Sequence, residues 1–249
     1  IIIGKLNYGA KANLKKAVSF SVSQADLGLT KIPQGWQFDH VIAINASDLN
    51  LSVNKEESAP FEVHIQPGKV LLNGRLDSDQ NYKGRFTLNE AALLLPQSDL
   101  SLKAVSVDAQ FGDATRNDIA RFTIGQVQHQ TPQALFKTLS VSGNVEIQRI
   151  GDRPLMYVLA MTAGVSDLRY LKLTAEHAPE KGDGNLIVQL TPLRFKPKGL
   201  QPRALFPVLE AFENVMGSIT ANARIDWKKS GISQSHGKFE LQGISFTHE

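Results

Sequence analysis

The chain has 249 residues, of which 42% are hydrophobic and 20% are charged, and its formal net charge is +3. This composition argues against a disordered chain, and no run approaches the ~18 apolar residues of a membrane-spanning helix. Because the chain has no cysteine, disulfides, thiol catalysis and cysteine-ligated metal sites are excluded. Its basic residues form only short runs, as in residues 11–16, so we interpret them as a solvated polar face rather than a nucleic-acid site.

Apolar residues alternate with polar ones in most of the first half, which is typical of strands with one apolar and one polar face. Such runs cover residues 36–44, 61–65 and 70–72, with a turn at Pro67-Gly68 between the last two. Residues 89–95, which precede Pro96, fit either a short helix or a strand. The apolar parity changes next to Ala104, which predicts a β-bulge there.

The second half continues the same pattern. Alternating runs cover residues 139–147, 171–175, 186–190 and 219–227, and residues 182–185 form a strong hairpin signal. A short helix is possible after Pro132, and Gly243 marks a predicted bulge or kink.

One segment, residues 202–216, predicts an amphipathic helix. Pro202 suits a first-turn position and Gly217 a C-terminal cap. The apolar residues of this segment fall on one broad helical face: Leu205, Phe206, Val208, Leu209, Phe212, Val215 and Met216.

About a dozen strands with so little helix predict a mainly-β protein with a long antiparallel sheet. The apolar face of such a sheet is buried against a second sheet, by closure into a barrel, or by curling into a trough for an apolar ligand. Composition alone favours the first two arrangements.

An ordered series of segments in the second half carries a family resemblance. The series comprises residues 122–125, Pro132, residues 139–143, 193–195, 199–202 and 217–221, and Trp227. It resembles the YdbH branch of the AsmA-like bacterial intermembrane proteins, formerly linked to dicarboxylate transport. The resemblance is strongest over residues 119–246 and rests on strand rhythm alone before them.

The resemblance implies a strongly curled sheet that forms a taco-like hydrophobic groove and carries phospholipid between the inner and outer membranes. It also implies a periplasmic protein with an N-terminal inner-membrane anchor, and a small outer-membrane lipoprotein as partner. The chain begins at Ile1 and stops just after a strand-like pattern, so we expect residues 1–249 to be a single elongated segment of a longer protein. The anchor and the part that contacts the partner would then lie outside this segment.

The candidate groove lining combines the alternating apolar residues with the predicted helix. Aliphatic side chains suit acyl chains because their contacts are non-directional, and each buried methylene contributes ~0.8 kcal/mol. The lipid-binding candidates are Ile42, Ile44, Val63, Ile65, Val141, Val145, Ile147, Leu171, Leu173, Leu186, Val188, Leu190, Phe206, Leu209, Phe212, Ile219, Ile225 and Trp227.

The sequence predicts no catalytic site, no cofactor and no metal site. No nucleophile elbow, zinc-protease motif, phosphate-binding loop or dinucleotide fingerprint is present, and the six histidines lack metal-ligand spacing. We therefore expect a non-enzymatic lipid carrier. The alternatives are a closed β-sandwich that serves as a binding or scaffold module of the cell envelope, and a hydrolase that uses Asp and His from distant strands.

Overall fold

The computed structural model describes residues 20–248 except 34, 47–48, 56–57, 67, 77–81, 113–116, 132–133 and 151–152. Strands make up most of these residues, and they belong to one antiparallel sheet that is not closed. The chain divides into two compact units, residues 1–125 and 126–249. The mainly-β, antiparallel class predicted from the sequence is therefore confirmed, and a closed barrel is not formed by the described strands.

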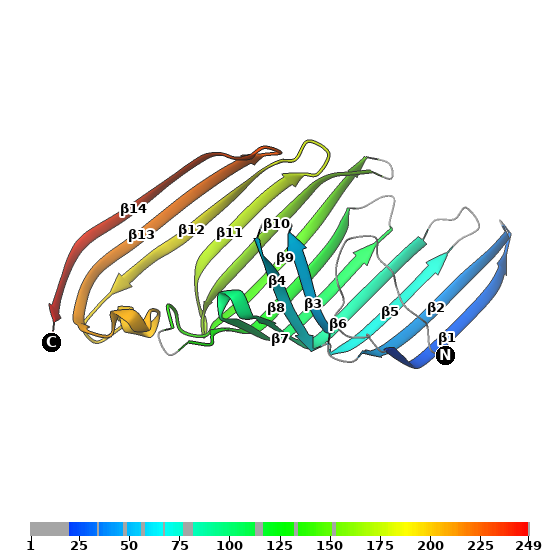
Figure 1. The fold of residues 1–249 in the computed structure, drawn as a ribbon, viewed down its shortest axis with the longest axis horizontal. Helices are drawn as coiled ribbons and strands as arrows, with labels where there is room; N and C mark the ends of the chain where they lie inside the picture. Colours follow the sequence, from blue (N-terminus) through cyan, green and yellow to red (C-terminus); the bar gives the residue numbers. More distant parts are fainter. Residues whose placement is uncertain are drawn as a thin grey trace. The chain divides into compact units, whose positions relative to one another are not determined.

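The first unit contains strands β1 to β7 and most of β8 (Figure 1). Its neighbouring strands run β1-β2-β5-β6-β7-β8, while β4 pairs with both β3 and β6. The long strand β6 pairs with β5 through residues 82–89 and with β4 through residues 92–94. The bounds are β1 Phe20–Ile32, β2 Gly35–Ala46, β3 Leu49–Lys55, β4 Ser58–Gln66, β5 Lys69–Leu76, β6 Tyr82–Leu95, β7 Leu100–Phe111 and β8 Asp118–His129.

The second unit is a meander in which each strand pairs with the next along the chain, from β9 to β14. Figure 1 shows these strands side by side in sequence order. Their bounds are β9 Leu139–Ile150, β10 Arg153–Val165, β11 Leu168–Ala178, β12 Asp183–Phe195, β13 Phe212–Lys228 and β14 Gly231–His248. Within the described residues, β14 has β13 as its only strand neighbour and is an edge strand.

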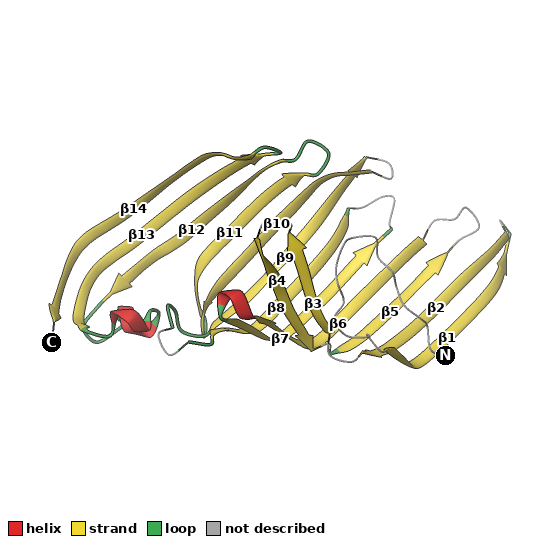
Figure 2. Cartoon of the chain, viewed as in Figure 1, coloured by secondary structure: helices red, strands yellow, loops and turns green. Residues whose placement is uncertain are grey.

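The helix predicted over residues 202–216 is wrong. Only two short 3₁₀ turns form, η2 (Pro202–Ala204) and η3 (Pro207–Leu209), and Phe212 already begins β13 (Figure 2). Pro207 lacks the N–H that a continuous helix needs at this position, and its ring clashes with the carbonyl four residues earlier. Gly217 is not a helix cap but lies inside β13 with φ +111°.

Several other local predictions are confirmed. Residues 89–95 are strand, and the next turn, η1 (Pro96–Ser98), starts at the proline. Register shifts and positive φ angles at Ala104 and Gly243 confirm both predicted bulges. The turn near residue 182 joins β11 to β12. Pro67 lies outside the described residues, so the turn predicted there remains a prediction. Residues 134–138 are described and contain no helix, so the short helix suggested after Pro132 does not form in them.

Candidate functional site: an apolar sheet face

The candidate site is one face of the second unit's sheet. Residues paired across antiparallel strands project to the same face, so the register defines continuous cross-strand rows. One row runs Val145, Leu159, Ala175, Leu186, Ile225; the next runs Gly143, Met161, Leu173, Val188, Ala223; and a third runs Val141, Ala163, Leu171, Leu190, Ala221. We call these three rows, with Ile219, the apolar face.

The opposite face of the same strands is polar. Its rows include Ser142, Thr162, Lys172, Gln189 and Asn222, which are paired across five strands. Hydrogen bonds within this face join Ser142 to Thr162 (3.4 Å) and Asn185 to Glu176 (3.3 Å), and an ion pair joins Arg224 to Asp226 (2.8 Å). The alternation therefore separates a mainly polar, water-facing side from an apolar one.

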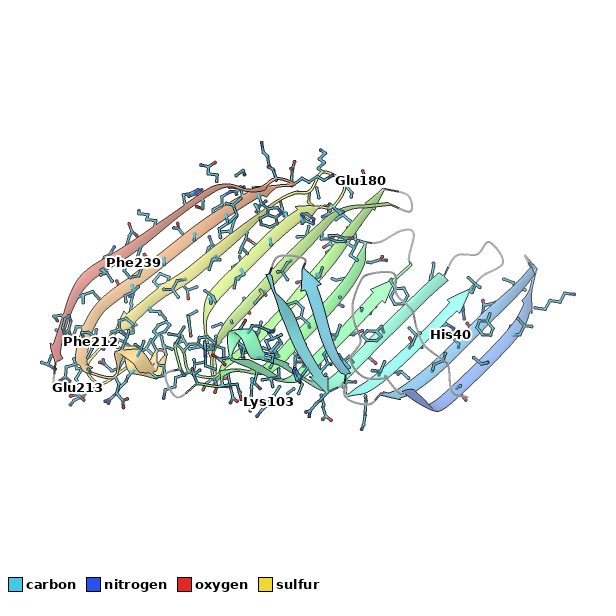
Figure 3. All side chains as sticks on the ribbon, viewed as in Figure 1. His40, Lys103, Glu180, Phe212, Glu213 and Phe239 are labelled. Carbon is cyan, nitrogen blue, oxygen red and sulfur yellow. The ribbon has the colours of Figure 1, made fainter. Side chains whose placement is uncertain are left out.

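Most of the apolar face is only half-buried. Val141 and Ala163 are buried, whereas Leu173, Leu186, Val188 and Ile225 retain intermediate exposure. On the edge strand β14, Phe239 is 63% exposed and Leu241 54% exposed, although they pair with Ala221 and Ile219 of this face; Figure 3 labels Phe239. A closed sandwich core buries such side chains, so this face lacks a permanent cover among the described residues.

One end of the apolar face is covered by the connection between β12 and β13. We call residues 196–211 the cap segment. Its Leu205 is 1% exposed and packs with Leu193, Phe195, Tyr170 and Val215 in the buried cluster of this unit. Burial in this cluster raises the pKa of the Tyr170 phenol.

Hydrogen bonds hold the cap segment in place. The side-chain amide of Gln201 accepts from the Val215 N–H (2.9 Å) and donates to the Val215 carbonyl (3.0 Å), as a neighbouring strand would. The Lys137 N–H donates to the Leu205 carbonyl (2.8 Å), and Arg203 pairs with Glu213 (3.3 Å). Figure 3 shows Phe212 and Glu213 at this end of the unit.

A row of polar-tipped rings borders the other end of the apolar face. Tyr157 pairs with His177, which pairs with Gly184, which pairs with Trp227. The ring centroids of His177 lie 6.3 Å from Tyr157 and 6.1 Å from Trp227. We call Tyr157, His177 and Trp227 the aromatic row. Beyond it lies the turn between β11 and β12, which contains the labelled Glu180 (Figure 3).

The first unit has the same alternation. One of its rows joins Ala25, Ile42, Leu72, Phe86 and Ala109 across five strands, while the opposite face carries the ion pairs Arg75–Asp39 (2.8 Å) and Arg85–Asp108 (2.6 Å). On its edge strand β1, Leu27 and Leu29 are about two-thirds exposed, at 65% and 64%.

Most of the predicted lining residues with described side chains lie in the second unit. Those on its strands share one face: Val141, Val145, Ile147, Leu171, Leu173, Leu186, Val188, Leu190, Ile219, Ile225 and Trp227. Phe206 and Phe212 pack against the buried cluster at the cap, and Leu209 lies in η3. Ile42 and Ile65 belong to the first unit, and the side chains of Ile44 and Val63 lie outside the described part.

The contribution of β10 to this face is not visible in the sequence pattern. Its members Tyr157, Leu159 and Met161 alternate with Val158 and Ala160, which are also apolar but project to the polar side. Because both parities are apolar, the period of two is hidden in this strand. The role of His177 is likewise not visible there, since it depends on its cross-strand neighbours.

Comparisons with known protein families, curated proteins and solved structures find no match. Within the described ranges, no three His, Asp or Glu side chains lie close enough together to hold a metal ion. No helix in that part of the chain has the length and apolar character needed to cross a membrane.

Proposed function

We propose that the apolar face holds phospholipid acyl chains and that the protein is a non-enzymatic carrier of phospholipid between membranes. The observation that carries this proposal is an aliphatic surface five strands wide that is left half-exposed while the other face of the same strands is polar. Exposed apolar patches of this extent mark binding surfaces in soluble proteins.

The side chains of the three rows suit a sliding cargo. Burial of apolar area contributes about 25 cal/mol per Å², so acyl chains gain free energy anywhere along the face. Val, Leu, Ile, Met and Ala make contacts without directional preference, and the three rows contain no side chain that would hydrogen-bond a tail at one position. A tail therefore moves between neighbouring strands without crossing a strongly favoured position.

Two alternative functions are less well supported. A β-sandwich scaffold needs a second layer over the apolar face, and the described strands all belong to one sheet. A hydrolase needs titratable groups that converge in a pocket, whereas the carboxylates with shifted pKa values lie on the polar faces in ion pairs with Arg75, Arg85, Arg224 and Lys238.

The cellular setting rests on the sequence resemblance to the YdbH branch of the AsmA-like proteins. We propose that the chain belongs to a protein with a taco-like groove in the periplasm, that the full-length protein is anchored in the inner membrane, and that a small outer-membrane lipoprotein is its partner. The curled groove is the arrangement in which this apolar face would enclose lipid tails while headgroups stay hydrated.

A charge on each side of β12 tests the lipid function. Val188 belongs to the apolar face and Gln189 to the polar face, so Val188→Asp and Gln189→Asp place the same group one residue apart. We expect Val188→Asp to abolish co-purified phospholipid, because a buried carboxylate opposes tail binding, and Gln189→Asp to retain it. Extraction and mass spectrometry of the purified chain measure the lipid.

A photo-crosslinking side chain at Val145, with Asn144 on the opposite face as control, gives a second measurement. Lipid adducts are expected at position 145 and not at position 144. The scaffold alternative is favoured instead if no phospholipid is recovered from the wild type and neither position forms an adduct.

A further inference from the structure

We infer that the aromatic row and the lysines beyond it form a headgroup-end site, which fixes how a phospholipid lies on the apolar face. This inference rests on the proposed function and adds an orientation to it. The glycerol–ester region lies at Tyr157, His177 and Trp227, the phosphate lies at the turn beyond them, and the tails run along the strands toward the cap segment.

The length of the uncovered face fits one acyl chain. From Trp227 to Ala221, where the face reaches the residues packed under the cap segment, β13 rises about 20 Å at ~3.3 Å per residue. A bilayer's hydrocarbon core is about 30 Å thick, so the tails of one leaflet span roughly 15 Å. A tail laid parallel to the strands therefore fits between the aromatic row and the cap segment.

The two ends of the apolar face differ in chemistry, because one ends in a buried apolar cluster and the other in rings with polar tips. At the cap end, Leu193, Phe195 and Leu205 are each no more than 3% exposed, so a headgroup there would be buried without hydrogen-bond partners. At the other end, the rings of the aromatic row combine apolar bodies with polar tips, and two of them, Tyr157 and Trp227, are of the residue types enriched at membrane–water interfaces.

His177 Nδ1 has two hydrogen-bond neighbours and satisfies only one of them at a time, which leaves the other available to a ligand. The Trp227 Nε1–H donates to His177 Nδ1 at 3.3 Å, and the same Nδ1 lies 3.1 Å from the Asp183 carbonyl oxygen. Nδ1 of a neutral imidazole either donates or accepts, so it satisfies only one of these neighbours at a time. When Nδ1 carries the proton and donates to Asp183, the indole N–H is available to a lipid ester carbonyl.

Basic residues lie directly beyond the aromatic row. Lys228 ends β13 and Lys229 follows it in the turn to β14, and both are exposed. A Cβ added to Gly182 would lie 2.9 Å from the Lys229 Cβ, so the β11–β12 and β13–β14 turns are adjacent.

The charges of these two turns sum to a small positive value. Lys181 also lies at this end, together with the acidic residues Glu180 and Asp183, which leaves one net positive charge among the five groups. This charge complements a lipid phosphate.

Depth-dependent fluorescence quenching tests the orientation. The chain has two tryptophans, so Trp36→Phe leaves Trp227 as the only reporter, and Phe206→Trp in a chain lacking both natural tryptophans reports from the cap end. The probes are phosphatidylcholines brominated either near the ester or near the terminal methyl. We expect Trp227 to lose more fluorescence to the ester-proximal bromines and the tryptophan at position 206 to lose more to the terminal bromines.

The outcomes separate the two proposals. Equal or reversed quenching at the two reporters overturns the orientation while leaving lipid binding intact. If neither bromolipid quenches either reporter and no lipid is extracted, the proposed function itself fails.

A charge reversal in the turn provides a variant that leaves the sheet untouched. Lys229→Glu should weaken binding of phosphatidylglycerol about fivefold or more, since one basic residue near an anionic surface contributes about that factor. Lys172→Glu, an exposed change on the polar face of β11, is the matched control and should leave binding unchanged. Equal affinities for the two variants would remove the turn from the site.

Discussion

At the scale of single residues, the place of Trp227 depends on the missing side chain of Gly184. The two residues are register partners, and a Cβ added at Gly184 would collide with the indole ring and with the Glu176 carbonyl oxygen. The indole ring thus crosses β12 above the glycine and reaches His177 on β11. Without this opening, the aromatic row would be interrupted at its centre.

The change Gly184→Ala should therefore displace Trp227. We expect a loss of about 1–3 kcal/mol in the free energy of unfolding, as for other overpacked sites, and a red shift of the Trp227 emission in a Trp36→Phe background. Gly28→Ala in β1 is the control, because a Cβ there meets its nearest atoms at 3.9 Å. Unchanged emission in the Gly184→Ala variant would contradict the proposed contact. Urea unfolding measures the stability of both variants.

The sequence predicts which face of the sheet a residue occupies. It does not predict which residues on other strands lie next to it. Alternation placed Val145, Leu173, Val188 and Ile225 on one face, because a strand's side-chain period is independent of its partners. The contact of Trp227 with His177 joins residues 50 apart, and it depends on the register of three strands. No local pattern in the sequence specifies that register.

At the scale of elements, the cap segment behaves as a fixed cover over one end of the apolar face. Its proline-started turns η2 and η3 place Leu205 in the buried cluster, while Gln201 pairs with Val215 like a short strand. The apolar spacing of residues 205–216 is also that of a helix, which explains the wrong prediction. Pro207 determines the outcome, because it interrupts the helical hydrogen bonds in the middle of the segment.

Two substitutions in the cap segment should differ sharply in their effect. Leu205→Ala should cost about 2–5 kcal/mol in the free energy of unfolding, because it leaves a cavity at a site with 1% exposure. Val208→Ala removes two carbons from a side chain that is 65% exposed and should change stability by no more than ~0.5 kcal/mol. Denaturant titration of both variants measures the difference, and similar midpoints would show that the cap segment is not packed as described.

At the scale of the whole molecule, each unit combines an apolar face with an opposite face that carries ion pairs. In the first unit the pairs are Arg75–Asp39 and Arg85–Asp108, and in the second they are Arg224–Asp226 and Lys238–Glu240. The antiparallel class follows from the composition and the turn spacing. Composition and turn spacing do not predict whether the sheet closes into a barrel, because closure depends on the twist and stagger accumulated over many strands.

These ion pairs predict how stability depends on pH. Hydrogen bonds from Arg75, Arg85 and Arg224 hold the pKa values of Asp39, Asp108 and Asp226 below the ordinary value of 3.8. The unfolded chain therefore takes up protons at a higher pH than the folded one. The contribution of these ion pairs to the free energy of unfolding is complete above about pH 5, where the carboxyls are ionised in both the folded and the unfolded chain. This stabilising contribution is lost as the pH falls through 3.8, the ordinary pKa of these carboxyls, and then through their lower pKa values in the folded chain.

We expect urea midpoints to stay level above about pH 5 as far as these groups determine them, and to fall below about pH 4. The fall should be modest, because the three pairs are partly exposed and screened by solvent. A variant with Asp39→Asn, Asp108→Asn and Asp226→Asn should start from a lower midpoint at neutral pH and lose less on acidification. Parallel titration curves for the variant and the wild type would show that other carboxylates govern the acid response.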